Sequence, residues 1–240
     1  MELKPIRTDN RDIRGHYAGA QDAAYTTAES QKVLRNTYLL LALTMVPTVI
    51  GAFIGMQTAG VIIASPIISS LVMLAAVIGL QFAIAANRNS GLGVALLLLM
   101  TGILGWWLGP ILNVALSMSN GMALVGYAAV GTGAIFLTMG VVAQTAKRDF
   151  SFMGKFLFVG MIALLLAMFA NMWLQIPALA LTISTLVIVV FSLFLLYDLQ
   201  RIIRGGETNY VMATTGVYMS LFNIFANLLY LLMALTGERE

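Results

Sequence analysis

This 240-residue chain contains no cysteine and only one histidine, His16. Without cysteine there is no disulfide, no thiolate nucleophile and no cysteine-ligated metal ion. Because His16 lies near the N-terminus, far from the apolar part of the chain, a histidine-activated nucleophile or histidine metal site within a membrane is also excluded. We therefore expect no enzymatic activity, no cofactor and no metal site.

Charged residues are also scarce. They make up only 10% of the chain, whereas 60% of the residues are hydrophobic and the mean hydropathy is +0.92. A soluble domain cannot cover its surface with so few charges, so lipid is the expected solvent for most of the chain. The basic residues that give the formal charge of +3 stand at the ends of apolar runs, where they orient a membrane protein, so nucleic acid is not an expected partner.

Long apolar runs follow one another from about residue 34 to the C-terminus. A helix of roughly 20 apolar residues crosses a membrane, so these runs predict an all-α membrane protein with seven transmembrane helices. The expected spans cover residues 34–56, 62–86, 92–116, 122–145, 153–174, 178–204 and 210–235. Small residues at close spacing, namely Gly131, Gly133 and Gly140, are expected to permit close helix packing.

The basic residues occupy every second gap between the apolar runs. With this arrangement Arg239 is the only one of the 13 Lys and Arg residues that falls on the opposite side of the membrane. Basic segments remain on the cytoplasmic side of a membrane. We therefore expect a cytoplasmic N-terminus and a periplasmic or extracellular C-terminus.

Residues 1–33 are mostly polar and mix both signs of charge with Pro5 and Gly15. A cleavable signal peptide would place its apolar core closer to the first residue. Because the segment lacks sustained apolar periodicity, we expect it to be a flexible cytosolic tail. The transmembrane domain is then expected over residues 34–236.

One acidic residue, Asp198, falls inside an expected span. A carboxylate at such depth usually faces a cavity or a partner and marks an ion or proton path. The alternative is an ordinary surface pair with Arg201, one turn further along the helix. The next helix carries a polar stripe at helical spacing, formed by Gly216, Ser220, Asn223 and Asn227. This stripe either belongs to the same ion path or pH sensor, or makes polar contacts between packed helices.

Five segments together resemble the Bax inhibitor-1 family, and most closely its bacterial branch. They are KVLRNTYLLLALT, GWWLGPILN, AKRDFSFMGKFLFVG, NMWLQIPAL and IIRGGETNYVMATTGVYMSLFNIF. The resemblance extends from about Ser30 to Thr236, and the GGETNY motif followed by Ser-Leu-Phe-Asn is its most specific part.

The resemblance implies a seven-helix fold with a central last helix, located in the bacterial inner membrane. It implies a regulator that associates with the FtsH-type membrane protease and modulates it. In some bacterial members it also implies a pH-sensitive calcium leak, in which two aspartates on the last two helices share a proton. Asp198 matches the first of these aspartates, but Ser220 stands at the second position. This departure favours the protease modulator, with the calcium or proton path through Asp198 as the alternative.

Overall fold

The computed structural model describes residues 10–150 and 152–237, with side chains for residues 28–150 and 152–236. This part of the chain is helical and contains no strand. Its elements are α1 (Asn10–Gln57), α2 (Ala59–Ile63), α3 (Pro66–Ala86), α4 (Gly91–Trp107), α5 (Gly109–Ser117), α6 (Gly121–Thr145), α7 (Met153–Leu174), α8 (Pro177–Ile203) and α9 (Tyr210–Gly237). Seven stretches of these helices are long and apolar enough to span a membrane, which confirms the expected fold class.

Two of the expected spans contain a break close to a proline. The second expected span, over residues 62–86, begins within the short helix α2 and restarts at Pro66, the first residue of α3. The third is interrupted at Leu108, between α4 and α5. Pro110 has no backbone N–H to donate within the helix, so the chain breaks just before it.

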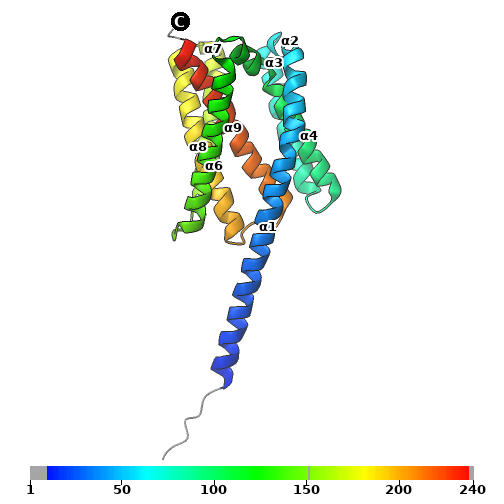
Figure 1. Cartoon of the computed structure of the whole chain (residues 1–240), viewed down its shortest axis with the longest axis vertical. Coiled ribbons are helices and arrows are strands. Elements are labelled where there is room, and N and C mark those ends of the chain that lie inside the picture. The colour runs from blue at the N-terminus through cyan, green and yellow to red at the C-terminus, as the bar shows by residue number, and fades with distance from the viewer. Residues whose placement is uncertain (1–9, 151, 238–240) are drawn as a thin grey trace, which may run out of the picture.

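The helix α1 begins well before the first expected span. Its backbone is helical from Asn10, whereas residues 10–33 were expected to be irregular. This difference has a simple cause, because the segment from Ala18 to Ala28 is rich in alanine, the strongest helix former. In Figure 1 the N-terminal half of α1 extends beyond the end of the bundle. Residues 1–9 lie outside the described part of the chain, and the division at residue 33 stays a prediction.

The last helix, α9, is central. It packs against α8 and α6 on one side and against α1, α4, α3 and α5 on the other. Figure 1 shows it running obliquely between these two groups of helices. Its side chains Val217, Ile224 and Leu229 are fully buried. The central position of the last helix, implied by the family resemblance, is therefore confirmed.

A polar contact joins three helices in the middle of the bundle. The Tyr218 hydroxyl of α9 lies 2.7 Å from Thr48 Oγ1 of α1 and donates to the carbonyl oxygen of Thr101 of α4, at 3.3 Å. Tyr218 is only 2% exposed. A buried phenol needs such partners because an unpaired hydroxyl in an apolar interior is costly. This contact fixes the depth of α9 relative to α1 and α4.

Helices α1 and α4 pack closely, at glycines other than those expected. A β-carbon at Gly105 would lie 2.8 Å from the carbonyl carbon of Thr48, and one at Gly51 would lie 2.9 Å from that of Gly102. By contrast, a β-carbon at Gly133 or Gly140 would have no atom within 4 Å. The expectation for these two glycines is therefore wrong, because spacing alone does not show which helix face meets a neighbour.

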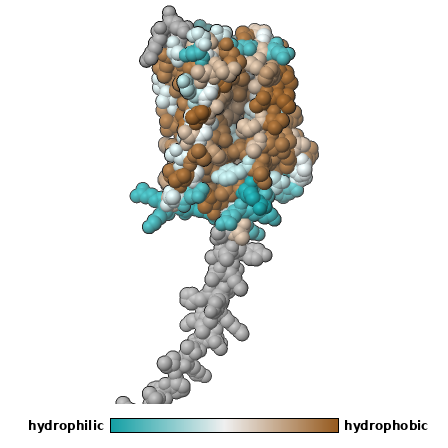
Figure 2. Space-filling view, viewed as in Figure 1, coloured by the Kyte–Doolittle hydropathy of each residue, from teal (hydrophilic) through white to brown (hydrophobic). Residues whose placement is uncertain are grey.

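The outer surface matches a lipid environment. Figure 2 shows hydrophobic residues around the side of the bundle and hydrophilic ones gathered at the end where α1 emerges. Large side chains such as Phe82, Met122 and Phe156 are 74–76% exposed. The loops at the hydrophilic end carry Arg88, Lys147, Arg148 and Arg204, and the last turn of α8 carries Arg201. We call this end the basic end. Its cytoplasmic orientation stays a prediction.

Candidate functional site

The expected site residues lie on the hairpin formed by α8 and α9. The connection spans residues 204–209 and turns at Gly205, whose φ of 74° is in the left-handed region that glycine adopts without strain. Asp198 lies on the last turns of α8, about five residues before the helix ends at Ile203. Gly216 lies on the second turn of α9, at a similar distance from the loop.

The Asp198 carboxylate lies against Gly216. A β-carbon at residue 216 would be 2.7 Å from Asp198 Oδ2 and 3.1 Å from its Cγ. The absence of a side chain at Gly216 therefore leaves the space that the carboxylate occupies. Ser220, which stands at the second aspartate position in the family resemblance, lies one turn further from the basic end than Gly216 and is 2% exposed.

Arg201 forms no salt bridge with Asp198. Its guanidinium forms an ion pair with Glu207 of the loop, at 3.2 Å, and its Nε donates to the carbonyl oxygen of Gly206. Among the described residues, no basic group lies within 4.0 Å of the Asp198 carboxylate and no donor hydrogen-bonds to it. The surface-pair interpretation of Asp198 therefore lacks its partner in this structure.

The two asparagines of the polar stripe bond along their own helix. Asn223 Nδ2 donates to the carbonyl oxygen of Met219, and Asn227 Nδ2 donates to that of Asn223, each at 2.8 Å. Asn227 also lines a groove near the end of the bundle opposite the basic end. The four residues of the polar stripe therefore lie at successive depths along α9 and do not form one cluster.

Side chains at the end of α8 hold the loop between α6 and α7. Gln200 accepts from the backbone N–H of Phe150 at 2.7 Å and donates to the carbonyl oxygen of Arg148 at 2.8 Å. Arg204 donates to the carbonyl oxygens of residues 146–148, at 2.8–3.3 Å. Gln200 is 2% exposed. Buried amide groups of this kind fix backbone position because each unpaired one would be costly.

Asn209 performs a similar role for the loop between α3 and α4. Its Oδ1 accepts from the backbone N–H groups of Val211 and Met212, which caps the start of α9. Its Nδ2 donates to the carbonyl oxygen of Arg88 at 2.9 Å and to Asn89 Oδ1 at 2.8 Å. The α8–α9 connection thus joins all three loops of the basic end into one surface.

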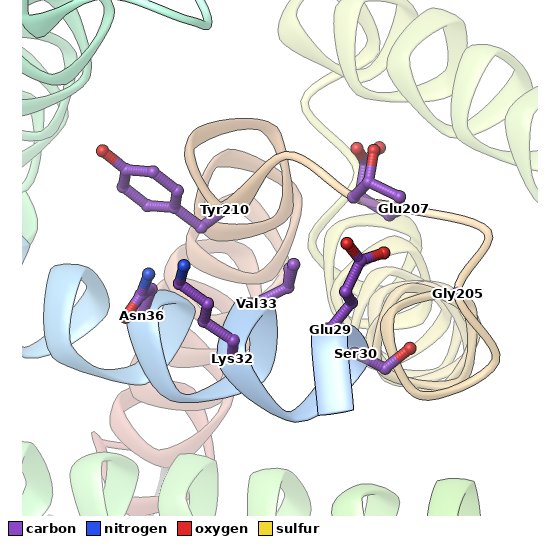
Figure 3. Close-up of a pocket in the computed structure, with 9 residues that line it drawn as sticks. Glu29, Ser30, Lys32, Val33, Asn36, Gly205, Glu207 and Tyr210 are labelled. Carbon is purple, nitrogen blue, oxygen red and sulfur yellow. The ribbon is translucent and has the colours of Figure 1, made fainter. Parts of the chain in front are cut away.

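A polar cavity of about 380 Å³ lies between α1 and this connection. Figure 3 shows Glu29 of α1 pointing toward Glu207, with Lys32 and Asn36 of α1 on the side nearer Tyr210. Buried Ser30 also lines the cavity, at the point where α1 leaves the bundle. Sequence reasoning missed Gln200, Asn209 and this cavity. Gln200 and Asn209 could have been recognised as polar residues at the ends of helices. The cavity had no such sequence signal, because Glu29 and Ser30 fell in the expected tail.

The sequence matches a known protein family and several bacterial membrane proteins. The family model described as inhibitor of apoptosis-promoting Bax1 matches residues 30–237. A membrane protein of Vibrio cholerae serotype O1 is 40% identical over 206 residues, which cover 86% of this chain and 91% of that protein. The modulator of FtsH protease YccA of Escherichia coli K12 is 39% identical over 203 residues, which cover 85% of this chain and 90% of YccA.

A second E. coli relative, from serotype O6:H1, is called inner membrane protein YccA and matches to the same extent. Together with the seven apolar helices, these relatives identify a multi-pass protein of the bacterial inner membrane. The family match covers most of the chain, and the relatives match over nearly their whole length. This chain therefore belongs to the Bax inhibitor-1 family.

Proposed function

We propose that this protein is a non-enzymatic regulator that associates with an FtsH-type membrane protease and modulates its activity. The observation that carries the proposal is the 39% identity with the E. coli modulator of FtsH protease over 90% of that protein's length. The family match over residues 30–237 includes nearly all of the seven spans and the connection between α8 and α9. The proposal thus transfers the role of a whole protein and not that of a single motif.

The basic end is the surface that we assign to the protease. Its three loops are held together by Gln200, Arg204 and Asn209, so a partner would meet a fixed surface. The N-terminal half of α1 extends from this same end. A protease that works from the cytosolic face would therefore reach both the surface and the N-terminal segment without entering the membrane.

The proposal is tested by co-purification and by proteolysis. The tagged protein is isolated in mild detergent from cells that contain the FtsH-type protease, and the protease is detected by immunoblot. In parallel, the purified protease degrades a membrane substrate in proteoliposomes with and without this protein. We expect co-purification and slower degradation. Absence of both effects would reject the proposal.

A second candidate function is a pH-sensitive cation leak through Asp198. It is favoured by one observation, that the Asp198 carboxylate lies within a span and has no basic partner within 4.0 Å among the described residues. Carboxylates in this situation often mark ion paths. Ser220 cannot share a proton with Asp198 as a second carboxylate would, so we rank this function below protease modulation.

A further inference from the structure

A second cavity, distinct from the proposed protease surface, lies near the end of the bundle opposite the basic end. It is a groove of about 290 Å³ with α8 as its floor and with α7, α9 and α5 beside it. Ile183 and Ser184 of α8 are both buried there, at 5% and 7% exposed. The groove is close in size to the smaller ligand pockets of proteins.

The hydroxyl of Ser184 is unpaired. Ser184 is buried as a residue, its hydroxyl oxygen remains accessible where the residue lines the groove, and no described residue hydrogen-bonds to it. Ser192, on the same helix and similarly buried, instead donates to the carbonyl oxygen of Ile188 at 2.7 Å. A serine in a membrane helix usually satisfies its hydroxyl in this way. An unpaired hydroxyl of a buried residue that lines a groove is available to hydrogen-bond a ligand there.

Other polar groups converge on the same groove. Asn171 of α7 already accepts a hydrogen bond through Oδ1 from the Ile176 N–H, which leaves its amide hydrogens available. Asn227 donates through Nδ2, which leaves its Oδ1 available. Tyr230 also lines the groove. Donors and acceptors are both present, and no charged residue lines the groove, so its ligand is polar but uncharged at this position.

The depth of the groove indicates the part of the ligand that it holds. Ser184 follows the first residue of α8, Pro177, by seven positions, about 10 Å along a helix that is about 40 Å long. The hydrocarbon layer is about 30 Å thick, so the groove lies just inside its edge. At the edge of the hydrocarbon layer, the uncharged polar groups of a glycerolipid are its ester linkages. The acyl chains of such a lipid would continue along the apolar side of α7.

We propose that this groove binds the glycerol-ester region of a glycerolipid, with Ser184 donating a hydrogen bond to an ester carbonyl oxygen. Asn171 supplies a second donor, and Asn227 accepts from a glycerol hydroxyl where one is free. This inference does not depend on the proposed protease function. The same chemistry is offered by a membrane phospholipid and by diacylglycerol, and the competition experiment below separates these two sources.

The test uses the full chain in vesicles of dialkyl-ether phospholipid, which contain no ester carbonyl. A diacylglycerol with a photoreactive group on one acyl chain is added, irradiated and located by peptide mass spectrometry. We expect labelling of α7, α8 or α9 beside the groove. Ser184→Ala should reduce it about fivefold, the effect of one lost hydrogen bond. The matched control Ser192→Ala should leave the labelling unchanged.

Unlabelled competitors test the chemistry. A diacylglycerol ester should displace the probe, whereas its dialkyl-ether analogue should not. Competition by an ester phosphatidylglycerol as strong as that by diacylglycerol would identify a membrane phospholipid as the ligand, and weaker competition would identify diacylglycerol. Equal labelling of Ser184→Ala and Ser192→Ala, or equal competition by ester and ether, would overturn the proposal.

Discussion

Arg201 of α8 forms an ion pair with Glu207 of the α8–α9 connection, at 3.2 Å, and forms no salt bridge with Asp198 on its own helix. The pair stabilises the turn at the basic end, where the backbone N–H groups of Gly206 and Glu207 also donate to the Arg201 carbonyl oxygen. Asp198 instead lies against Gly216 of α9. The basic end and the buried carboxylate are therefore separate features that different variants can test.

Asn209 is expected to contribute to stability in two separable ways. Asn209→Ala removes both the cap of α9 and the bonds to Arg88 and Asn89, and a lost cap alone costs about 1 kcal/mol. Asn209→Asp keeps the capping oxygen but loses the donor. Thermal unfolding in detergent micelles should rank the wild type above Asn209→Asp and this above Asn209→Ala. Equal melting temperatures for all three would contradict the assigned contacts.

Gly105 tests the close packing of α4 on α1. Its β-carbon would meet the backbone of Thr48 and not a movable side-chain tip, so Gly105→Ala should destabilise the protein by about 1–3 kcal/mol. Gly133→Ala is the matched control, because it has open space around it and should stabilise α6 by about 0.5–1 kcal/mol. The comparison is made from denaturant or thermal unfolding midpoints. A similar effect of the two substitutions would show that this helix contact is misplaced.

Asp198 tests the second candidate function. If it lines an ion path, Asp198→Asn should change cation flux into liposomes and flatten its dependence on pH, because the titrating group is removed. Ser220→Asp restores a second carboxylate on α9 and should create or sharpen a pH dependence. Flux is measured with a calcium-sensitive dye inside the vesicles. Equal impermeability of the wild type and both variants would reject the leak.

The N-terminal segment is expected to be where the protease takes hold. The first span begins at Ala28, so a deletion of residues 3–25 should leave an inserted bundle. The truncated protein should be degraded more slowly than the full chain and should accumulate as an inhibitor. Pulse-chase in cells with and without the protease measures this. Equal half-lives would remove the segment from the mechanism.

The control for the truncation experiment is a test of membrane orientation. The protease can reach residues 3–25 only if the basic end is cytoplasmic. A periplasm-active reporter fused after Lys147 should therefore be silent.

The seven spans could be predicted because the lengths of apolar runs and the rise of a helix set them directly. Packing could not be predicted in the same way. Gly133 was expected at a close contact and has none, whereas Gly51 and Gly105, each the first glycine of a Gly-x-x-x-Gly pattern, make close contacts that were not expected. The sequence shows which residues are small but not which helix face meets a neighbour.

The candidate site was predicted only in part. Asp198 is conspicuous as a carboxylate within an apolar run, and this can be recognised without a structure. Its partner on α9 depends on where the connecting turn begins and ends, and the turn places Gly216 beside it where the sequence suggested Ser220. The roles of Gln200 and Asn209 depend on loops distant in sequence, so they required the fold.

Substrate degradation by the purified FtsH-type protease, with and without this protein in the same proteoliposomes, tests the central claim most directly. The rate is followed by loss of a labelled membrane substrate over time. Modulation of the protease predicts a slower, dose-dependent rate with the full chain. An unchanged rate at every ratio of this protein to the protease would contradict it.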